Sequence, residues 1–333
     1  MPSPSKKFFV FVTRRFADSG IKALQKAGHR VEIYEKDENI PRTELLKRVK
    51  GCDALLPLLT DRIDAEVFEA AGPQLKIIAN YAVGFDNVDL VEARKRGIVV
   101  TNTPSDAVNE SVAEHAFALL LALAHRISEA DQFAKAGKYT GWSPTQFIGT
   151  DVRGKTLGLI GAGRIGSMMA KKAVQGFDMK LVYADAHENL LLERDYGAAR
   201  LPITKLLQQS DYVSLHVPLL PSTRHLISTA EFSSMKKTAF LINTSRGPVV
   251  DEKALLRALK TKRIAGAALD VFECEPAIDC DLTDTLELRT FLNVILTPHI
   301  ASATIEAREA MSMVAAQNIL AIFEGKPALT PAK

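Results

Sequence analysis

The sequence has few of the features that mark secreted, metal-binding or membrane-spanning proteins. Its 333 residues include three cysteines, and no two of these form a Cys-x-x-Cys pair. This scarcity argues against a disulfide framework and a cysteine-rich zinc site, and it indicates a reducing compartment. The apolar run near the start of the chain, residues 8–12, is too short for a signal-peptide core or a membrane span. We therefore expect a cytoplasmic protein without a metal site or a membrane partner.

An excess of charge of one sign is also absent. The chain has 42 Lys and Arg residues against 39 Asp and Glu residues, which gives a net charge of +3. A nucleic-acid-binding surface usually requires a clustered basic excess, so we expect no nucleic-acid partner. Hydrophobic residues make up 47% and charged residues 24% of the chain, which is typical of a folded protein. At roughly 150 residues per domain, the length corresponds to about two domains.

Short apolar runs rich in strand-forming residues alternate with longer helical patterns along the chain. This alternation predicts strand–helix–strand crossovers and parallel sheets. Several runs lack polar alternation, as is typical of strands covered on both faces. The first set of predicted strands comprises residues 8–12, 30–34, 54–58, 75–80 and 97–101, and the second set comprises residues 156–160, 180–184, 212–215, 239–243, 265–269 and 294–296. Five strands followed by six predict an α/β fold with two doubly wound parallel-sheet domains.

Two long helical patterns lie outside these strand sets. The first covers residues 109–136 and is followed by a glycine-containing loop at 137–149. We expect this helix to link the domains or to pack across a subunit boundary. The second covers residues 304–323, and no predicted strand follows it.

A glycine-rich turn follows the predicted strand at 156–160. Its sequence is Gly161-Ala162-Gly163-Arg164-Ile165-Gly166, and a helical pattern comes after it. In such a unit the first glycine permits a tight turn, the second lets the backbone approach a pyrophosphate, and the third lets helix and strand pack closely. The helix N-terminus then offers amide groups and a positive dipole end to the phosphates. We interpret the segment as a Rossmann-type dinucleotide-binding turn, with a purely structural turn as the alternative.

Asp185 lies 19 residues after Gly166, at the end of the next predicted strand. A carboxylate at this place accepts hydrogen bonds from the hydroxyls of an adenosine ribose. The carboxylate also repels a ribose 2′-phosphate, and Ala186 supplies no cation to hold one. The sequence therefore predicts that NAD(H) is preferred over NADP(H).

Five further motifs follow one another over nearly the whole chain. They are NYAVGFDN at 80–87, SVAEH at 111–115, NTSRG at 243–247, LDVFECEP at 269–276 and TPHI at 297–300. With these motifs the sequence resembles the D-isomer-specific 2-hydroxyacid dehydrogenases, particularly the glyoxylate/hydroxypyruvate reductase branch. The resemblance implies an oxidoreductase that uses NADH to reduce a small 2-oxo acid to the D-2-hydroxy acid.

The resemblance also implies that Arg246, Glu275 and His299 are catalytic, and their chemistry fits these roles. The planar guanidinium of Arg246 can bind the carboxylate and ketone of a 2-oxo acid. His299 can give a proton to the ketone oxygen as hydride reaches the carbon, while Glu275 accepts a hydrogen bond from the other ring nitrogen. Each residue comes just after a predicted strand, where ligands bind in open α/β sheets. Taken singly, each has a structural alternative, namely a surface ion pair, a loop carboxylate and a helix cap.

Further contacts to substrate and cofactor are implied by the resemblance alone. The backbone amides of Val83 and Gly84 would bind the substrate carboxylate, together with Arg246 and His299, in a cleft between the domains. Besides the glycine-rich turn and Asp185, the implied cofactor contacts are Val217, Pro218, Thr223, Thr244, Ser245, Arg246, Asp270, His299 and Ala301.

The positions of the motifs, read with the resemblance, imply a discontinuous outer domain around a central one. Residues 1–103 with 300–333 are expected to form a flavodoxin-like substrate-binding domain, and residues 104–299 a Rossmann NAD-binding domain. A homodimer built mainly by the nucleotide-binding domains is also implied. Trp142 either enters the substrate pocket of the partner subunit, as in family relatives, or anchors its own loop. We interpret the acidic segment at 277–285 as a solvated loop, because no adjacent histidine completes a metal-ligand set.

Other activities on the same fold stay open. A 2-ketogluconate reductase or another D-2-hydroxyacid dehydrogenase would share these motifs. Phosphite dehydrogenases have a lysine where this chain has Val83, and formate dehydrogenases pair a glutamine with the histidine where this chain has Glu275. The alternative of a different class is an NADH-sensing corepressor, a binding module that usually carries extra interaction segments. We expect few such segments in this chain, with residues 1–6 and 328–333 as the only loose ends.

Overall fold

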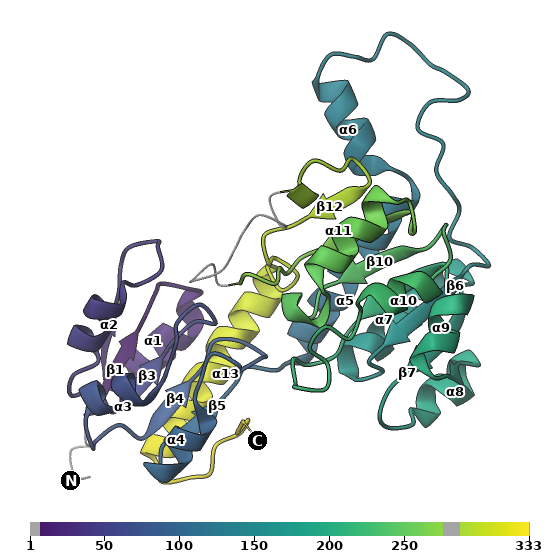
Figure 1. Ribbon diagram of the computed structural model, residues 1–333. Coiled ribbons are helices and arrows are strands. Elements are labelled where there is room, and N and C mark those ends of the chain that lie inside the picture. The colour runs from purple at the N-terminus through teal and green to yellow at the C-terminus, as the bar shows by residue number, and fades with distance from the viewer. Residues whose placement is uncertain (1–6, 276–286, 333) are drawn as a thin grey trace. The chain divides into compact units, whose positions relative to one another are not determined.

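The computed structural model of the chain describes residues 7–275 and 287–332, and Figure 1 labels most of its elements. Residues 1–108 with 303–333 form one compact unit, and residues 109–302 form the second. The boundaries predicted from the sequence, after residues 103 and 299, differ from these by five and three residues. The acidic segment at 277–285 lies outside the described residues.

The first unit is built on a parallel sheet with five described strands in the order β2-β1-β3-β4-β5. This is the flavodoxin-like order: β2 lies on one side of β1 and β3 to β5 lie on the other, so the topological switch point is between β1 and β3. Apolar side chains such as those of Phe11 and Ile78 are wholly buried in it. The elements of this unit are β1 (Phe9–Val12), α1 (Asp18–Lys26), β2 (Arg30–Ile33), α2 (Arg42–Arg48), β3 (Ala54–Leu56), α3 (Ala65–Ala71), β4 (Ile77–Ala79), α4 (Leu90–Lys95), β5 (Val99–Thr101) and α13 (Ile305–Phe323).

Helix α13, from the far end of the sequence, packs against α1 within the first unit. A glycine makes this close approach possible, because a Cβ at Gly20 would lie 2.1 Å from the carbonyl oxygen of Ser312. The Ser312 hydroxyl accepts a hydrogen bond from the amide of Gly20 at 2.9 Å and donates one to the carbonyl of Ala17 at 2.6 Å. The C-terminal helix is therefore an integral part of this unit.

The second unit has a parallel sheet with seven described strands in the order β12-β11-β10-β9-β6-β7-β8. Strands β7 and β8 lie on one side of β6 and β9 to β12 lie on the other, so the topological switch point is between β6 and β9, as in the Rossmann order. Together the two sheets confirm the predicted fold class. The elements are α5 (Asp106–Ala124), α6 (Ile127–Lys135), β6 (Thr156–Ile160), α7 (Arg164–Phe177), β7 (Lys180–Ala184), α8 (Leu190–Tyr196), β8 (Ala199–Arg200), α9 (Ile203–Gln209), β9 (Tyr212–Leu215), α10 (Thr229–Ser234), β10 (Phe240–Asn243), the 3-10 turn η1 (Gly247–Val249), α11 (Glu252–Lys260), β11 (Gly266–Leu269) and β12 (Val294–Leu296).

Two elements of the second unit differ from the prediction. The helix expected over residues 109–136 is two helices, α5 and α6, because Arg126 between them has the left-handed conformation with φ 54°. The second sheet has a seventh strand, β8, where six were expected. This strand has two residues, both exposed, so it leaves no hydrophobic pattern in the sequence.

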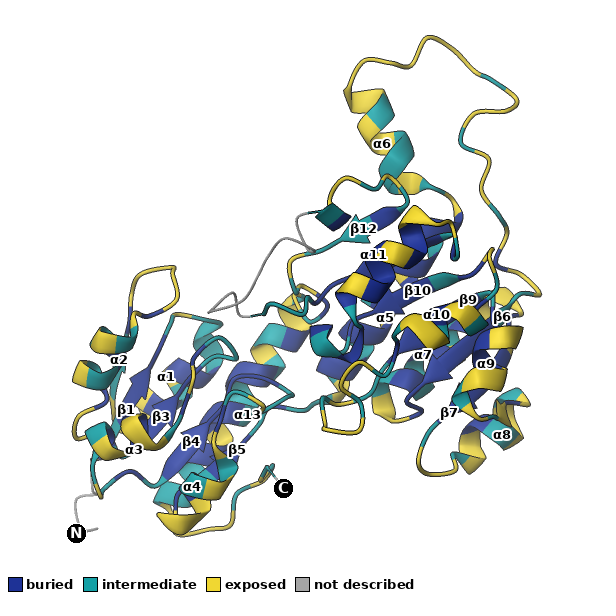
Figure 2. Cartoon of the chain, in the orientation of Figure 1, coloured by how far each residue is buried: buried dark blue, intermediate teal, exposed yellow. Residues whose placement is uncertain are grey.

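Helix α5 is, within the described part of the chain, the one helix that is long and apolar enough to cross a membrane by those criteria alone. Its apolar side chains have another role, because Phe117 and Leu120 share a hydrophobic core with Leu159 of β6 and Ile242 of β10. Figure 2 shows the central strands β3, β4 and β9 as buried, whereas α6 has no buried residue. The apolar composition of α5 is therefore explained by its packing on the second sheet.

The two cysteines in the described part of the chain differ in state. Cys52 is a buried free thiol, and burial raises its pKa to about 12. Cys274 is disulfide-bonded, which departs from the expectation of reduced thiols that followed from the low cysteine count.

Candidate active site

Three neighbouring strands of the second sheet bring the predicted catalytic residues to one edge. Strands β10, β11 and β12 lie side by side and run parallel. Arg246 follows the end of β10, Glu275 follows β11 and His299 follows β12. Because parallel strands end at the same edge of a sheet, all three residues emerge at its carboxyl edge, where ligands bind in this class of fold.

His299 and Glu275 form a hydrogen-bonded pair through the Nδ1 atom of the ring and Oε1 of the carboxylate. Their side chains are 25% and 23% exposed, so the pair lies partly shielded but reachable by a small molecule. The carboxylate accepts the Nδ1 proton, which fixes the ring orientation. No described residue forms a hydrogen bond with Nε2 of His299. The geometry thus leaves Nε2 as the atom that can exchange a proton with a ligand.

The turn that carries His299 is held by the buried carboxylate of Asp270. His299 itself has a φ of 54°, a left-handed conformation that is uncommon for a residue with a side chain. Its amide donates to the carbonyl of Asp270 at 2.9 Å, and the Asp270 carboxylate accepts the amides of Ile300 at 2.9 Å and Ala301 at 2.8 Å. The surrounding protein therefore determines this conformation.

The charge of Asp270 is stabilised by hydrogen bonds in spite of its burial. Burial alone would raise its pKa, but hydrogen bonds from His115, from Thr297 and from the two turn amides hold the pKa below its usual value. Several protein donors already bind the Asp270 carboxylate. Asp270 therefore stabilises the turn of His299 whether or not it also contacts a cofactor.

His115 belongs to the motif at 111–115, but the sequence alone assigns it no role. Its Nε2 atom on α5 lies 3.1 Å from Oγ1 of Thr297 and 3.4 Å from the Asp270 carboxylate. Ser111, one helical turn earlier, donates to the carbonyl of Ala301 at 2.8 Å. Helix α5 therefore supports the same turn through two polar residues on one face. The spacing of four residues between them was the signal available in the sequence.

Arg246 lies in a loop that packs tightly against the segment leading to Glu275. A Cβ at the next residue, Gly247, would lie 1.8 Å from the backbone of Phe272, so only glycine fits there. The Asn243 side-chain amide donates to the carbonyl of Arg246 at 2.9 Å, and Nη1 of Arg246 donates to the carbonyl of Ser245 at 2.8 Å. These contacts position the arginine backbone beside the loop that carries the histidine partner.

The glycine-rich turn has the geometry that dinucleotide binding requires. Gly161 has φ 96°, and a Cβ there would lie 2.6 Å from the carbonyl of His216. A Cβ at Gly166 would lie 2.2 Å from the carbonyl of Gly161, so the helix and the turn are in close contact. Gly163 caps α7 and has no heavy atom within 4 Å of its Cβ position, which leaves open space above the helix N-terminus. Arg164 and Ile165 then form the first turn of α7.

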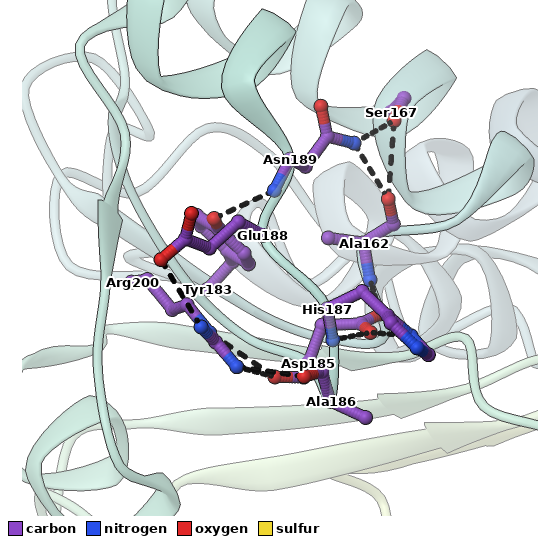
Figure 3. Close-up of polar contacts among 9 residues, drawn as sticks. All are labelled: Ala162, Ser167, Tyr183, Asp185, Ala186, His187, Glu188, Asn189 and Arg200. Atoms are coloured by element: carbon purple, nitrogen blue, oxygen red, sulfur yellow. Dashed lines mark hydrogen bonds and ion pairs between the residues drawn. The ribbon is translucent and has the colours of Figure 1, made fainter.

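Asp185 lies at the end of β7, directly beside this turn (Figure 3). One carboxylate oxygen accepts the amide of Ala162 at 2.7 Å, and the other accepts the amide of His187 at 2.9 Å. Each oxygen keeps lone-pair capacity for a further donor such as a ribose hydroxyl.

The remaining predicted cofactor residues differ in how far the protein itself satisfies them. Val217 underlies the glycine-rich turn, since its Cγ1 would lie 3.0 Å from a Cβ at Gly161, whereas Pro218 is exposed. The Thr223 hydroxyl donates to the carbonyl of Pro218 at 2.6 Å and closes its own loop. Among the described residues, the Thr244 hydroxyl is buried without a hydrogen-bond partner, while Ser245 donates to Asn243 at 2.8 Å.

His216 lies beneath the glycine-rich turn, where its Nε2 atom is 2.9 Å from Oγ of Ser214. Burial lowers its pKa from 6.5 to about 4. The unfolded chain therefore binds a proton between these pH values that the folded protein does not bind, and the free energy of unfolding falls as the pH falls from 6.5 toward 4.

We expect His216 to contribute up to about 1.4 kcal/mol per pH unit to the slope of the free energy of unfolding against pH. The His216→Asn variant should lose that contribution, as measured by urea unfolding at a series of pH values. The exposed His187, changed to glutamine, serves as the control and should leave the slope unchanged. Equal slopes in the wild type and the His216 variant would contradict the prediction.

In the first unit, the loop that contains Val83 and Gly84 is held by asparagines. Asn80 donates to the carbonyl of Gly84 at 2.9 Å, Asn102 donates to the carbonyl of Val83 at 2.7 Å, and Asn87 and Asn80 bond each other through both side-chain amides. No described acceptor receives the amides of Val83 or Gly84. The loop thus keeps its carbonyl groups bound and its amide groups available for an anion.

Comparison with known proteins agrees with this geometry. The family model "D-isomer specific 2-hydroxyacid dehydrogenase, NAD binding domain" matches residues 117–301. A glyoxylate reductase from Thermococcus litoralis is 48% identical over 321 residues, which are 95% of this chain and 94% of that protein. A solved structure from Thermus thermophilus is 41% identical with a TM-score of 0.89 and covers 98% of this chain and 100% of its own. An NADPH-dependent glyoxylate/hydroxypyruvate reductase from Sinorhizobium meliloti, in complex with NADP and malonate, is 30% identical with a TM-score of 0.81 and covers 98% of this chain and 97% of its own.

These similarities place the protein among the dehydrogenases with an NAD(P)-binding domain. More particularly, the chain belongs to the D-isomer-specific 2-hydroxyacid dehydrogenase family, which confirms the resemblance drawn from its motifs. The protein is therefore an oxidoreductase.

Proposed function

We propose that this protein uses NADH to reduce glyoxylate to the corresponding achiral 2-hydroxy acid, or hydroxypyruvate to the D-2-hydroxy acid, in the cytoplasm and as a homodimer. The observation that carries the proposal is the His299–Glu275 pair, which emerges from the same sheet edge as Arg246. The substrate class is supported by the 48% identity to a glyoxylate reductase.

Each residue of the trio has a defined task in this reaction. The reaction would draw its hydride for the carbonyl carbon from NADH when that cofactor is bound. Arg246 pairs with the substrate carboxylate and polarises the ketone oxygen. His299 gives the proton on Nε2 to that oxygen, so that the carbonyl becomes a secondary alcohol, or a primary one from glyoxylate, and the imidazole becomes neutral. Glu275 holds the Nδ1–H group and stabilises the imidazolium before the transfer.

The two units would divide the work. We propose that residues 1–103 with 300–333 form the substrate-binding domain, in which the amides of Val83 and Gly84 receive the substrate carboxylate. Residues 104–299 would form the NAD-binding domain. Support comes from the open amides of the first unit and from the family match of the second.

The residues around the glycine-rich turn fit a dinucleotide. The space above Gly163 admits a pyrophosphate at the N-terminus of α7, and the free lone pairs of Asp185 suit ribose hydroxyls. The Thr244 hydroxyl, which has no hydrogen-bond partner among the described residues, would gain one from the cofactor. We propose that Val217, Pro218, Thr223, Ser245, Asp270 and Ala301 complete the surroundings of the cofactor.

We propose a preference for NAD(H), and the Asp185→Ala variant tests it. Loss of hydrogen bonds to a charged group corresponds to roughly a 10- to 100-fold increase in the KM for NADH. The KM for NADPH should rise less, because the repulsion between carboxylate and 2′-phosphate is removed at the same time. Steady-state kinetics with both cofactors measures the ratio, and Asp195→Ala, which removes an exposed carboxylate paired with Arg194, is the control. A wild-type preference for NADPH, as in the Sinorhizobium relative, would contradict the assignment.

The proposed dimer is supported by an exposed apolar segment after α6. Tyr139 is 62% exposed, Trp142 83% and Ile148 66%. Sedimentation analysis of the wild-type protein should give a dimer, and a monomer at micromolar concentration would contradict it.

If Trp142 enters the partner's substrate pocket, Trp142→Ala raises the KM for the 2-oxo acid, whereas a loop anchor would leave this KM unchanged.

The overall proposal is tested by NADH oxidation with glyoxylate, hydroxypyruvate, 2-ketogluconate and pyruvate as substrates. Highest kcat/KM with glyoxylate or hydroxypyruvate is expected. Highest kcat/KM with 2-ketogluconate would favour the alternative reductase. Binding of NADH without turnover of any 2-oxo acid, together with binding of a partner peptide, would favour the corepressor alternative.

A further inference from the structure

Arg200 lies on the edge strand β8, which pairs parallel with β7 so that Arg200 stands opposite Tyr183. From this position its side chain reaches along β7 to the loop that follows it (Figure 3). Nη2 of Arg200 donates to the carbonyl oxygens of Asp185 at 3.0 Å and Ala186 at 2.8 Å, and Nε donates to that of Asp185 at 3.2 Å. Nη1 lies 3.5 Å from the carboxylate of Glu188. A cation thus stands beside the predicted ribose site, where the sequence around Asp185 led us to expect none.

Arg200 binds the backbone of Asp185, whereas other groups bind its carboxylate. The side chain of Asp185 is bound by the amides of Ala162 and His187, and its carbonyl is bound by the guanidinium. With both ends of the residue held, the direction in which the carboxylate points is determined before a ligand arrives. Preorganisation of this kind lowers the ordering cost of binding.

A second side chain ties the same loop to the glycine-rich turn. The Asn189 amide donates to the carbonyl of Ala162 at 2.7 Å and to the Ser167 hydroxyl at 3.0 Å (Figure 3). The loop is thus fastened to the turn by Asn189 at its end and to β8 by Arg200 at its start. The carbonyls of Asp185 and Ala186 have no other described side-chain donor.

We propose that Arg200 is a positioning residue for the adenosine ribose of the cofactor, acting through the backbone of Asp185 and Ala186. The inference rests on the proposed dinucleotide-dependent function and adds a residue to it. The described hydrogen bonds and ion pair of Arg200 all go to the loop at residues 185–188, beside the proposed ribose site, so its effect should be confined to ligands that contain the adenosine ribose.

The test compares ligands with and without that ribose in the full-length protein. We expect Arg200→Leu to raise the Kd for ADP-ribose, measured by calorimetry, by about tenfold. The KM for NADH should rise similarly, while kcat at saturating NADH and the KM for reduced nicotinamide mononucleotide stay unchanged. Arg200→Lys keeps one charged donor and should give an intermediate Kd. The matched control is Arg194→Leu on α8, whose exposed side chain pairs with its neighbour Asp195, and it should bind ADP-ribose as the wild type does.

Three results would overturn the inference. Wild-type affinity of Arg200→Leu and Arg200→Lys for ADP-ribose would exclude a positioning role. An equal loss for NADH and for reduced nicotinamide mononucleotide would indicate general damage to the unit, and thermal unfolding of both variants would reveal it. A wild-type protein that binds neither NADH nor ADP-ribose would overturn the proposed function as well, which distinguishes that failure from a failure at Arg200 alone.

Discussion

Replacing His299 with glutamine is expected to lower kcat for reduction of the 2-oxo acid by about 10²–10⁴-fold, the usual contribution of a positioned general acid. Glutamine keeps a polar side chain but cannot supply a proton to the developing alkoxide. The KM of the variant for the 2-oxo acid should change little, because Arg246 and the backbone amides carry most of the proposed substrate binding. Steady-state rates of NADH oxidation over a range of substrate concentrations measure both constants.

The position of His299 makes the effect specific to its side chain. The backbone of the turn is held through Asp270, so the substitution leaves the hydrogen bonds of the Ile300 and Ala301 amides in place. His125→Gln changes an exposed histidine in the same unit and should retain wild-type kcat. Turnover at the wild-type rate in the His299 variant would exclude it as the acid.

Replacing Arg246 with glutamine is expected to lower kcat/KM by about 10²–10³-fold, as the loss of a charged donor to the reacting group does in other enzymes. Both kcat and KM should change, because the guanidinium binds the substrate and also orients its carbonyl group toward the proton donor. At 1.4 kcal/mol for each factor of ten, this loss is about 3–4 kcal/mol of transition-state stabilisation.

The lysine variant separates charge from geometry at the same position. Arg246→Lys keeps a positive charge but loses the planar pair of donors, so we expect it to recover less than tenfold of the lost kcat/KM. Arg153→Gln removes an exposed arginine that pairs with Asp178 and should behave as the wild type. A lysine variant with full activity would show that only the charge matters, and a fully active glutamine variant would remove Arg246 from the mechanism.

Strand prediction worked best in the second sheet. The expected ranges for β6, β7, β9 and β12 coincide with the observed ones. These strands are runs of apolar residues between turns, so local composition is sufficient to find them. The two-residue strand β8 forms because it completes the sheet edge beside β7, and pairing with a neighbour is not a local property.

The break between α5 and α6 could not be read from the sequence for a related reason. His125 and Arg126 continue the helical pattern in composition, and nothing local demands a left-handed residue there. The chain turns where packing of α5 on the second sheet ends, since Phe117 and Leu120 belong to its core while α6 contributes no buried residue. Tertiary contacts therefore decide where this helix ends.

The sequence by itself determined the α/β class, because strand composition is a local property of the chain. Its glycine spacing predicted the dinucleotide turn, and its motif order, through the family resemblance, predicted the proposed catalytic trio. Only the tertiary structure decided how these residues are held. It joined the Nδ1 atom of His299 to Glu275, and it brought Asp270 and His115 to the same turn. It also placed Arg200 over the backbone of Asp185, from a strand that local composition does not reveal. Such contacts depend on which strands become neighbours in the folded sheet, and this is a property of the whole chain.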